Sequence, residues 1–257
     1  MSAAAVAPAG ERGASLALQA VALRRRDDAI LADVSLAVAA GEHAVVLGAS
    51  GAGKSTLLRV ALGLERADAG RVELLGRDLA TLGSGARHRL RRRVGVLLAR
   101  DALFEDRSVE ENVALGVRVG TRAATRRAVR EALLLVGLKH VEHRRPGALA
   151  DGERRRVALA RAIAGRPALL VVDEPGAALD PVAAGAVHVL LGQLRARLEL
   201  AVLVATRDPR ALDGADRAHF LHAGRIAAAD RPELLRKRPD AALQQLLAGR
   251  PYGPIAP

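Results

Sequence analysis

A glycine-rich loop at residues 48–56 constrains the fold of this chain more than any other stretch. It reads GASGAGKST, which matches the pattern G-x-x-x-x-G-K-[ST]. The loop follows EHAVVLG, which we predict to be a short buried strand, and it opens KSTLLRVALGL, whose apolar spacing is helical. Glycines let such a loop turn tightly, so its backbone N–H groups point at phosphate oxygens, and the helix adds its positive N-terminal end. The sequence therefore predicts a strand–loop–helix unit that binds the phosphates of a nucleotide.

Each position of this loop is a candidate contact to the nucleotide. The backbone would cradle the phosphates, the Lys54 ammonium would reach the β- and γ-phosphates, and the Ser55 hydroxyl would be a ligand of Mg²⁺. The predicted nucleotide-binding residues of the loop are Gly48, Ala49, Ser50, Gly51, Ala52, Gly53, Lys54, Ser55 and Thr56.

A second motif supplies the acidic groups that such a loop needs. The stretch ALLVVDEP, residues 168–175, is a continuous aliphatic run typical of a buried parallel strand. Asp173 ends this strand, where its carboxylate would approach Mg²⁺, and Glu174 is placed to orient or deprotonate an attacking water. Acidic residues at a strand end are also common as solvated loop starts. The upstream loop favours the catalytic interpretation, with Lys54 and Glu174 as catalytic residues.

Strands that alternate with helices along the chain predict an α/β fold. Alternating apolar residues predict two strands at 15–23 and 30–38, joined by the turn RRRDD. A further strand is expected at RVELLG. We also expect a helix that is opened by Pro181 and, after it, a second buried strand at LAVLVAT. We expect a disordered tail at 1–15, one domain at 16–230 with a mostly helical insert at about 87–166, and a C-terminal helical tail at 231–257.

Composition narrows the class and the compartment. Half of the 257 residues are apolar, which fits a folded globular chain with an aliphatic core, since Phe, Tyr and Trp together number three. The chain has no cysteine, which excludes disulfides and thiolate metal sites. No apolar run reaches the roughly 18–20 residues of a membrane span, and the first residues lack a secretory pattern. We therefore expect a cytoplasmic protein with no direct insertion into a membrane.

The formal net charge of +12 does not decide the partner. A basic chain indicates nucleic acid or an anionic membrane surface as a partner, but an arginine- and alanine-rich genome would produce the same excess. The basic cluster RHRLRRR is expected to be a solvated helix face. The seven histidines show no spacing typical of metal ligands, so the one metal that we expect is nucleotide-bound Mg²⁺, held by Ser55 and Asp173.

Residues 149–181, LADGERRRVALARAIAGRPALLVVDEPGAALDP, resemble the signature-to-D-loop region of ABC ATPases. The resemblance implies a P-loop NTPase fold with a mixed-sheet core, an antiparallel β subdomain and an inserted α-helical subdomain. It also implies a dimer of cassettes that holds two ATP molecules between the phosphate loop of one subunit and the signature of the other. In this chain the signature positions are Ala150, Asp151 and Gly152. The insert and the adjoining Q-loop would contact a membrane permease.

Two further segments resemble the ATP-binding subunit of Mla-type phospholipid transporters. These are DALFEDRSVEENVALGVR and the C-terminal LQQLLAGRPYGPI. This resemblance implies lipid transport across the bacterial envelope and a peripheral location at the cytoplasmic face of the inner membrane. The alternative for the second segment is a generic amphipathic end helix, which we expect to pack on a partner subunit.

Several positions depart from the ABC pattern. Arg25 stands where an aromatic side chain stacks on adenine, although a guanidinium plane can also stack on a base. Ala99 replaces the Q-loop glutamine, and Ala150 and Asp151 replace the signature serine and first glycine. We expect Asp151 to cap the following helix. Arg207 replaces the histidine that contacts the γ-phosphate. It would either bind that phosphate as an arginine finger, which makes it a third catalytic candidate, or form a salt bridge with Asp208 or another acid and point away.

Three functions are consistent with this pattern. The first is a working transport ATPase whose activity is weak or depends on its partner. The second is a regulatory cassette of a heteromeric transporter that binds MgATP without hydrolysing it. The third, a soluble ABC protein acting on nucleic acid, is the least favoured, because such proteins commonly carry two cassettes or long coiled coils, which are absent here.

Overall fold

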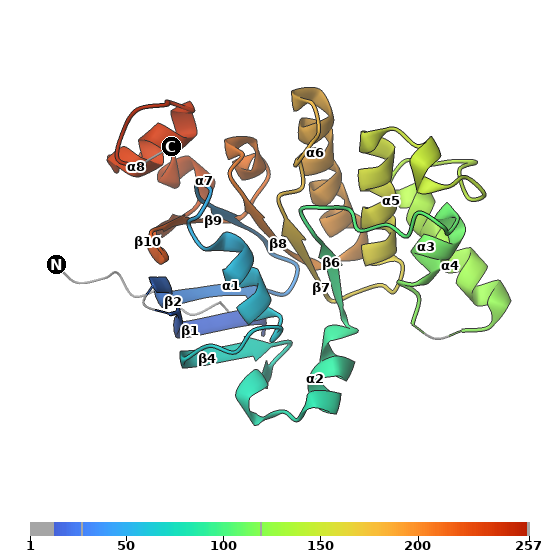
Figure 1. Ribbon diagram of the computed structural model, residues 1–257, viewed down its shortest axis with the longest axis horizontal. Helices are drawn as coiled ribbons and strands as arrows, with labels where there is room; N and C mark the ends of the chain where they lie inside the picture. Colours follow the sequence, from blue (N-terminus) through green and yellow to red (C-terminus); the bar gives the residue numbers. More distant parts are fainter. Residues whose placement is uncertain (1–12, 27, 119, 256–257) are drawn as a thin grey trace.

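The computed structural model describes residues 13–26, 28–118 and 120–255, which form two sheets with helices packed around them (Figure 1). The larger sheet has six strands in the order β10-β9-β3-β8-β7-β6. Its five strands from β9 to β6 are parallel, and β10 pairs antiparallel with β9. The strands are β3 (His43–Leu47), β6 (Val94–Leu97), β7 (Leu169–Asp173), β8 (Ala201–Thr206), β9 (Arg217–His222) and β10 (Arg225–Asp230). The expected buried runs are β3, β7 and β8, in which every residue is buried.

The smaller sheet is antiparallel, in the order β2-β1-β4-β5. It consists of β1 (Ala14–Arg25), β2 (Asp28–Ala39), β4 (Ala69–Leu74) and β5 (Arg77–Asp78). Helix α1 (Lys54–Ala61) shares a core with both sheets through Leu57 and Leu58. The predicted mixed-sheet core with an antiparallel β subdomain is confirmed.

The stretch 87–166, where we expected a mostly helical insert, contains helices separated by loops, and it also contains strand β6. Its helices are the last part of α2 (Ser84–Arg91), then α3 (Val109–Ala114), α4 (Arg122–Leu135) and α5 (Asp151–Ile163). Helices α3, α4 and α5 pack on one another, whereas β6 joins the six-stranded sheet beside β7. The strand has four residues and follows an arginine-rich helix, so the sequence offered no stretch long enough to display a strand period. Short 3₁₀ turns occur at Leu79–Thr81, Pro146–Ala148 and Pro209–Leu212.

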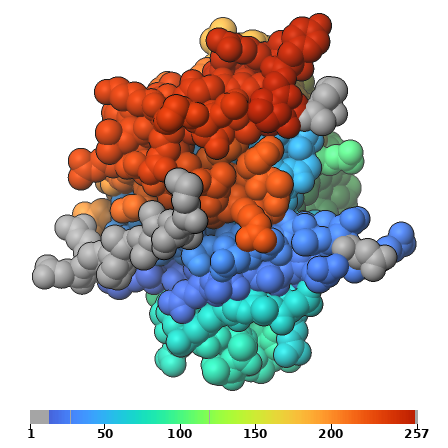
Figure 2. Space-filling view, turned by 90° about the vertical axis from the view of Figure 1, so that its left-hand side faces the viewer, coloured from blue at the N-terminus to red at the C-terminus, as the bar shows by residue number. Residues whose placement is uncertain are grey.

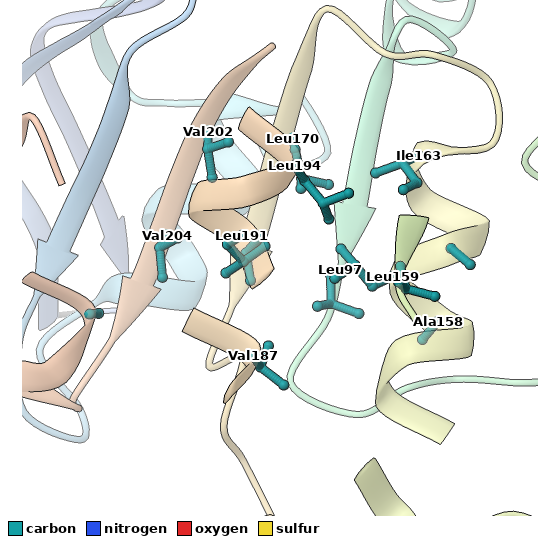
Figure 3. Close-up of a cluster of buried hydrophobic side chains, with 14 of the residues drawn as sticks. Leu97, Ala158, Leu159, Ile163, Leu170, Val187, Leu191, Leu194, Val202 and Val204 are labelled. Carbon is teal, nitrogen blue, oxygen red and sulfur yellow. The ribbon is translucent and has the colours of Figure 1, made fainter. Parts of the chain in front are cut away.

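An aliphatic core joins the six-stranded sheet to α5 and to α6 (Pro181–Leu198), which begins at the predicted proline (Figure 3). Leu97, Leu170 and Val202 from the sheet face Leu159 and Leu191 from the helices (Figure 3). Burying each such side chain contributes about 1.5–3 kcal/mol to folding. The core therefore fixes the ends of β6, β7 and β8, which carry the candidate site, relative to α5.

The C-terminal tail forms two short helices, α7 (Pro232–Leu235) and α8 (Ala241–Ala248). We expected this tail to pack on a partner subunit, but Leu235, Ala242 and Leu243 are buried in the core of the same chain. Figure 2 shows the segment (red) lying against the neighbouring part of the chain (orange). Sequence reasoning missed this packing of the tail on its own chain, and contact of the rest of the tail with a partner subunit stays a prediction. Among the described residues, no helix is long and apolar enough to cross a membrane.

Buried histidines make the fold sensitive to acid. His43, His188 and His219 are buried, and burial lowers the pKa of each, to about 4 for His219. Between the ordinary pKa of 6.5 and the folded value, the unfolded chain binds a proton that the folded chain does not. The contribution of these histidines to the free energy of unfolding is therefore fully present above pH 6.5, and it is lost as the pH drops toward 4. Urea unfolding should show about 2 kcal/mol lost from His219 alone between pH 7.5 and pH 5.

The His219→Leu variant should remove this part of the pH dependence, whereas His140→Asn, at an exposed position, should keep it. Equal pH slopes for His219→Leu and the wild-type chain would show that His219 is not responsible.

Candidate active site

The loop between β3 and α1 needs glycine at two positions where the backbone leaves no room for a side chain. Gly53, the N-cap of α1, has φ +103°, and a Cβ there would lie 2.9 Å from the Ile30 carbonyl oxygen. A Cβ at Gly48 would lie 2.6 Å from the Leu221 carbonyl oxygen. The chain therefore turns from the sheet into α1 along a path that only glycine permits at these points. This is the strand–loop–helix unit that the sequence predicted.

Lys54, the first residue of α1, is buried beneath the loop. Its Nζ donates hydrogen bonds to the carbonyl oxygens of Gly48 and Ala49, each at 2.9 Å. The same ammonium forms an ion pair with Glu174 Oε1 at 3.1 Å, and only 6% of the lysine side chain is exposed. Lys54 and Glu174, two of the three residues predicted to be catalytic, are therefore in direct contact, and the third is Arg207.

Glu174 is held from several sides immediately after β7. Its Oε2 accepts hydrogen bonds from Thr206 Oγ1 at 2.9 Å and from the Arg207 backbone N–H at 3.2 Å. Its backbone has φ +44°, a left-handed conformation that few non-glycine residues adopt. Sequence reasoning missed Thr206, although a polar residue at the end of the buried strand β8 was a signal for it. The two contacts to Oε2 orient the carboxylate. Oε1 is bound only to the Lys54 ammonium, so it is the oxygen that can exchange its partner when a ligand enters.

Asp173 supplies a buried oxygen atom that suits a cation. The residue ends β7 and is only 9% exposed, and burial raises the pKa of its carboxyl while a hydrogen bond from Ser55 opposes that shift. Among the described residues, Asp173 Oδ1 has no hydrogen-bond partner. Mg²⁺ is commonly held by one or two protein oxygens with water and substrate phosphates completing its shell. Ser55 and Asp173 fit such an ion, and the described residues contain no cluster of three or more His, Asp or Glu that would bind a metal without them.

Lys54, Ser55, Glu174 and Thr206 line one cavity of about 1110 Å³, whereas the predicted residues Gly48, Ala52 and Asp173 are not part of its lining. This volume is sufficient for a nucleotide, since typical ligand pockets measure about 300–1,000 Å³. The lining comes from distant parts of the chain: the loop after β3, the ends of β7 and β8, the β1–β2 turn and the last turn of α8. The lining residues that were predicted from the sequence are Arg25, Ala49, Ser50, Gly51, Gly53, Lys54, Ser55, Thr56, Glu174 and Arg207.

Arg207 lines the cavity and does not form the salt bridge considered from the sequence. Asp208 pairs instead with Arg210, at 2.6 Å, and lies 3.5 Å from His188 Nε2. Within the part of the chain that the structure describes, the Arg207 guanidinium has no ion pair or hydrogen bond. The salt-bridge alternative was wrong because Arg210, two residues from Asp208, reaches the same carboxylate. The arginine-finger alternative stays a prediction.

Arg25 also lines the cavity, but its guanidinium is held by an acid. It contacts both carboxylate oxygens of Glu65 at 2.7 Å, and the Arg25 side chain is 48% exposed. This contact is the main cause that lowers the pKa of Glu65, with Arg59 adding to it. The Glu65 pair fixes the plane of the Arg25 guanidinium at the cavity edge, and its stacking on adenine stays a prediction.

The signature positions lie apart from this cavity. Ala150, Asp151 and Gly152 are absent from its lining, so the structure does not bring them to Lys54 of the same chain. Asp151 was expected to be the N-cap of α5, but Ala150 has that position and Asp151 is the first helical residue. The Ala150 backbone N–H is satisfied by Glu153 instead. In the first turn the Asp151 carboxylate still interacts favourably with the positive end of the helix.

Ala99 follows β6, outside the cavity lining, and its backbone contacts a residue that sequence reasoning missed. The carbonyl oxygens of Leu98 and Ala99 accept hydrogen bonds from Arg155 Nη1, the second at 3.4 Å. Arg155 is only 3% exposed. Its helical spacing of three and four residues from the buried Ala158 and Leu159 was a signal that this arginine faces the core.

The fold and this cavity define a P-loop nucleotide-binding protein, with a phosphate loop, an acidic pair at the end of a buried strand, and an inserted helical group. A family model described as ABC transporter matches residues 31–177, which is more than half of the chain. The chain belongs to the ABC transporter family.

The similar proteins agree with this assignment. The chain is 40% identical over 201 residues to the methionine import ATP-binding protein MetN of Rhizobium johnstonii, a match that covers 77% of this chain and 56% of that protein. The chain thus spans little more than half the length of this curated relative. Two solved structures are 25% identical: cbiO1 from Clostridium perfringens, part of the ABC transporter complex cbiONQ, and the dimeric cassette MJ0796 bound to ADP and Pi. The first has a TM-score of 0.81 and covers 87% of this chain and 91% of that chain; the second has 0.76, 84% and 98%.

Proposed function

We propose that this chain is the ATP-binding subunit of an ABC transporter and that it hydrolyses ATP to ADP and phosphate. The observation that carries the proposal is the contact between Lys54 and Glu174 at the phosphate loop, beside the buried oxygen of Asp173. Lys54 would supply the cation for phosphate and Glu174 the base for water; both line the cavity, and Asp173, the neighbour of Glu174, would supply an oxygen for the metal. These are the parts that phosphoryl transfer to water requires.

From these contacts we infer an order in which the groups would act. When ATP enters, the Lys54 ammonium exchanges the Gly48 and Ala49 carbonyls for phosphate oxygens and leaves Glu174 Oε1. Glu174 Oε2 keeps its bonds to Thr206 and the Arg207 backbone, so the freed Oε1 is held ready to orient the attacking water and accept its proton. Ser55 and Asp173 would hold Mg²⁺, which neutralises charge on the phosphates when it is bound.

A second cassette and a membrane permease are the proposed partners. Residues 150–152 lie outside the cavity of their own chain, which supports their use at the nucleotide of a second subunit. The MJ0796 cassette bound to ADP and Pi is described as dimeric, and cbiO1 as part of a transporter complex. The expected location is the cytoplasmic face of the inner membrane, and no nucleic-acid partner is proposed.

For the cargo we propose a phospholipid, as the Mla-like segments imply. The support for this proposal is the resemblance of the C-terminal segment, whose two ends are joined by hydrogen bonds. Gln245 accepts a hydrogen bond from the Ile255 N–H at 2.8 Å and donates one to the Ile255 carbonyl at 3.0 Å. The MetN relative is named for methionine import, so a small solute is the alternative cargo. Phospholipid, and not methionine, should stimulate ATP turnover by the permease complex in proteoliposomes.

The competing proposal is a regulatory cassette that binds ATP without hydrolysing it, motivated by Ala99, Ala150, Asp151 and Arg207. ATP turnover decides between the two: the purified chain with its permease should exceed the background of Glu174→Gln. No turnover above that background would favour the regulatory cassette. Activity gained by the double variant Ala99→Gln with Arg207→His would show that these positions limit the rate.

Replacing Arg207 by alanine should lower the turnover number for ATP by about 100-fold, the typical effect of removing one preorganised donor to a transition-state oxygen. The reason is that its guanidinium lines the cavity and has no acidic partner within the described residues. Arg225→Ala removes the same charge from an exposed position on β10 and serves as the control, which should stay within threefold of wild type. Equal effects of both variants would mean that only net charge matters.

A further inference from the structure

Arg155, on α5, is a buried cation that makes no ion pair among the described residues. Its five N–H groups all donate to backbone carbonyl oxygens. Nε donates to Pro175 at 2.8 Å, and Nη2 donates to Asp173 at 3.1 Å and Glu174 at 2.8 Å. Nη1 donates to Leu98 and Ala99. Since a guanidinium has five donors, every one of them is used.

The two groups of carbonyls belong to neighbouring strands of the large sheet. Leu98 and Ala99 follow β6, and residues 173–175 include the end of β7 and the catalytic acids. The strands are in parallel register, with Leu97 opposite Val172, so both segments leave the sheet at the same edge. The Arg155 guanidinium lies between them and ties one to the other.

The environment of Arg155 requires arginine. Burial disfavours its charge and lowers the pKa of the guanidinium to about 10, although Asp101, Asp173 and Glu174 oppose this shift. At neutral pH the side chain is therefore still a cation, stabilised by carbonyl dipoles. Lysine would offer three donors from a single point and could not satisfy both segments.

Other arginines of α5 hold the same loop but do not reach β7. Arg154 pairs with Asp101 at 3.0 Å, and Arg161 donates to the carbonyl oxygens of Asp101 and Ala102, each at 2.8 Å. Arg155 alone among the described residues of α5 donates to both the loop and the end of β7. The loop also carries Leu98 and Phe104, which are 51% and 48% exposed, so a partner subunit can reach it.

We infer that Arg155 is a positioning residue that sets the orientation of Glu174 and couples it to the loop at residues 98–104. It holds the carbonyls of Glu174, whose own backbone is in the left-handed region, and of both its neighbours, and so fixes the direction in which the carboxylate leaves the chain. A movement of the loop shifts the same guanidinium and thereby Glu174. The inference rests on the proposed function, because Glu174 must act on bound ATP.

The chain has no tryptophan, so a single introduced one reports on the loop without background. Phe104→Trp replaces one exposed aromatic ring by another. Its emission should shift when saturating MgATP is added, because the end of β7 and the loop move together. Adding Arg155→Gln should abolish the shift and lower kcat for ATP by at least tenfold, while the Kd for MgATP stays within threefold.

Arg154→Gln is the matched control, because it removes contacts to the same loop from the same helix without touching β7. It should keep the emission shift and at least half of kcat. If Arg155→Gln does not fold, as judged by circular dichroism, the Arg155→Lys variant is used in its place. It should show a smaller emission shift and a lower kcat than wild type, with an unchanged KM.

Four results would overturn the inference: no shift in Phe104→Trp, a full shift in the Arg155 variant that folds, an unchanged kcat in that variant, or an equal loss in Arg154→Gln. Failure of the wild-type chain to bind MgATP is a different result, which contradicts the proposed function itself.

Discussion

Replacing Glu174 by glutamine is expected to lower the turnover number for ATP by about 10²- to 10⁴-fold, the range typical of losing a general base. Glutamine has nearly the same shape and can keep an oxygen toward Thr206 and the Arg207 N–H, but it cannot accept the proton of water. The variant also loses the ion pair with Lys54. The ammonium is then freer to bind phosphate, so the affinity for MgATP should be equal to that of wild type or higher.

The measurement is single-turnover hydrolysis of radiolabelled ATP, together with calorimetric binding. Glu131→Gln, at an exposed residue that pairs with Arg166, controls for the loss of a carboxylate and should match wild type. A Glu174→Gln chain that turns over ATP within tenfold of wild type would mean that another group activates the water.

The Lys54→Met variant is expected to bind MgATP and MgADP at least about 100-fold more weakly. The loss corresponds to about 2.7 kcal/mol, which lies within the 1.5–3 kcal/mol of one hydrogen bond to a charged group. Methionine fills the buried channel of the lysine stem, so the loop should keep its path. The carbonyl oxygens of Gly48 and Ala49 lose the donor that Lys54 supplies, so thermal stability has to be measured beside affinity.

Lys139→Met, at an exposed lysine after α4, is the matched control and should leave the Kd unchanged. Thermal unfolding of both variants without nucleotide separates a loss of affinity from a loss of structure. A Kd for Lys54→Met within threefold of wild type would remove Lys54 from the binding site.

The sequence predicted the parts of the site that are local in the chain. The loop at residues 48–56 carries its own geometry in its glycines, and β7 shows its burial in an unbroken aliphatic run, so both were found. Residues of the loop line the cavity, as does Glu174, which directly follows β7. Helix α6 was predicted in the same way, because Pro181 is a local signal for the start of a helix. Local sequence was sufficient where one segment determines its own structure.

What the sequence did not reveal depends on segments that meet only in the folded chain. Arg155 is one of three arginines in a row. Its helical spacing indicates which of them faces the core, but the carbonyl groups that it binds are brought together only by the packing of α5 on the sheet. Asp208 forms its ion pair with Arg210 and not with Arg207, and this depends on the turn after β8. Strand β6 is too short to have a period, and the packing of the tail on its own core required the positions of α7 and α8.

The last turn of α8 forms part of the cavity wall through residues 246–249. A nucleotide that gains contacts with this wall must bind more tightly when α8 is docked than when it is released. By thermodynamic reciprocity, the bound nucleotide then favours the docked helix by the same factor. A partner that releases α8 would therefore lower the affinity for the nucleotide. The docking of α8 and the binding of phosphate at the loop are thus linked in one equilibrium.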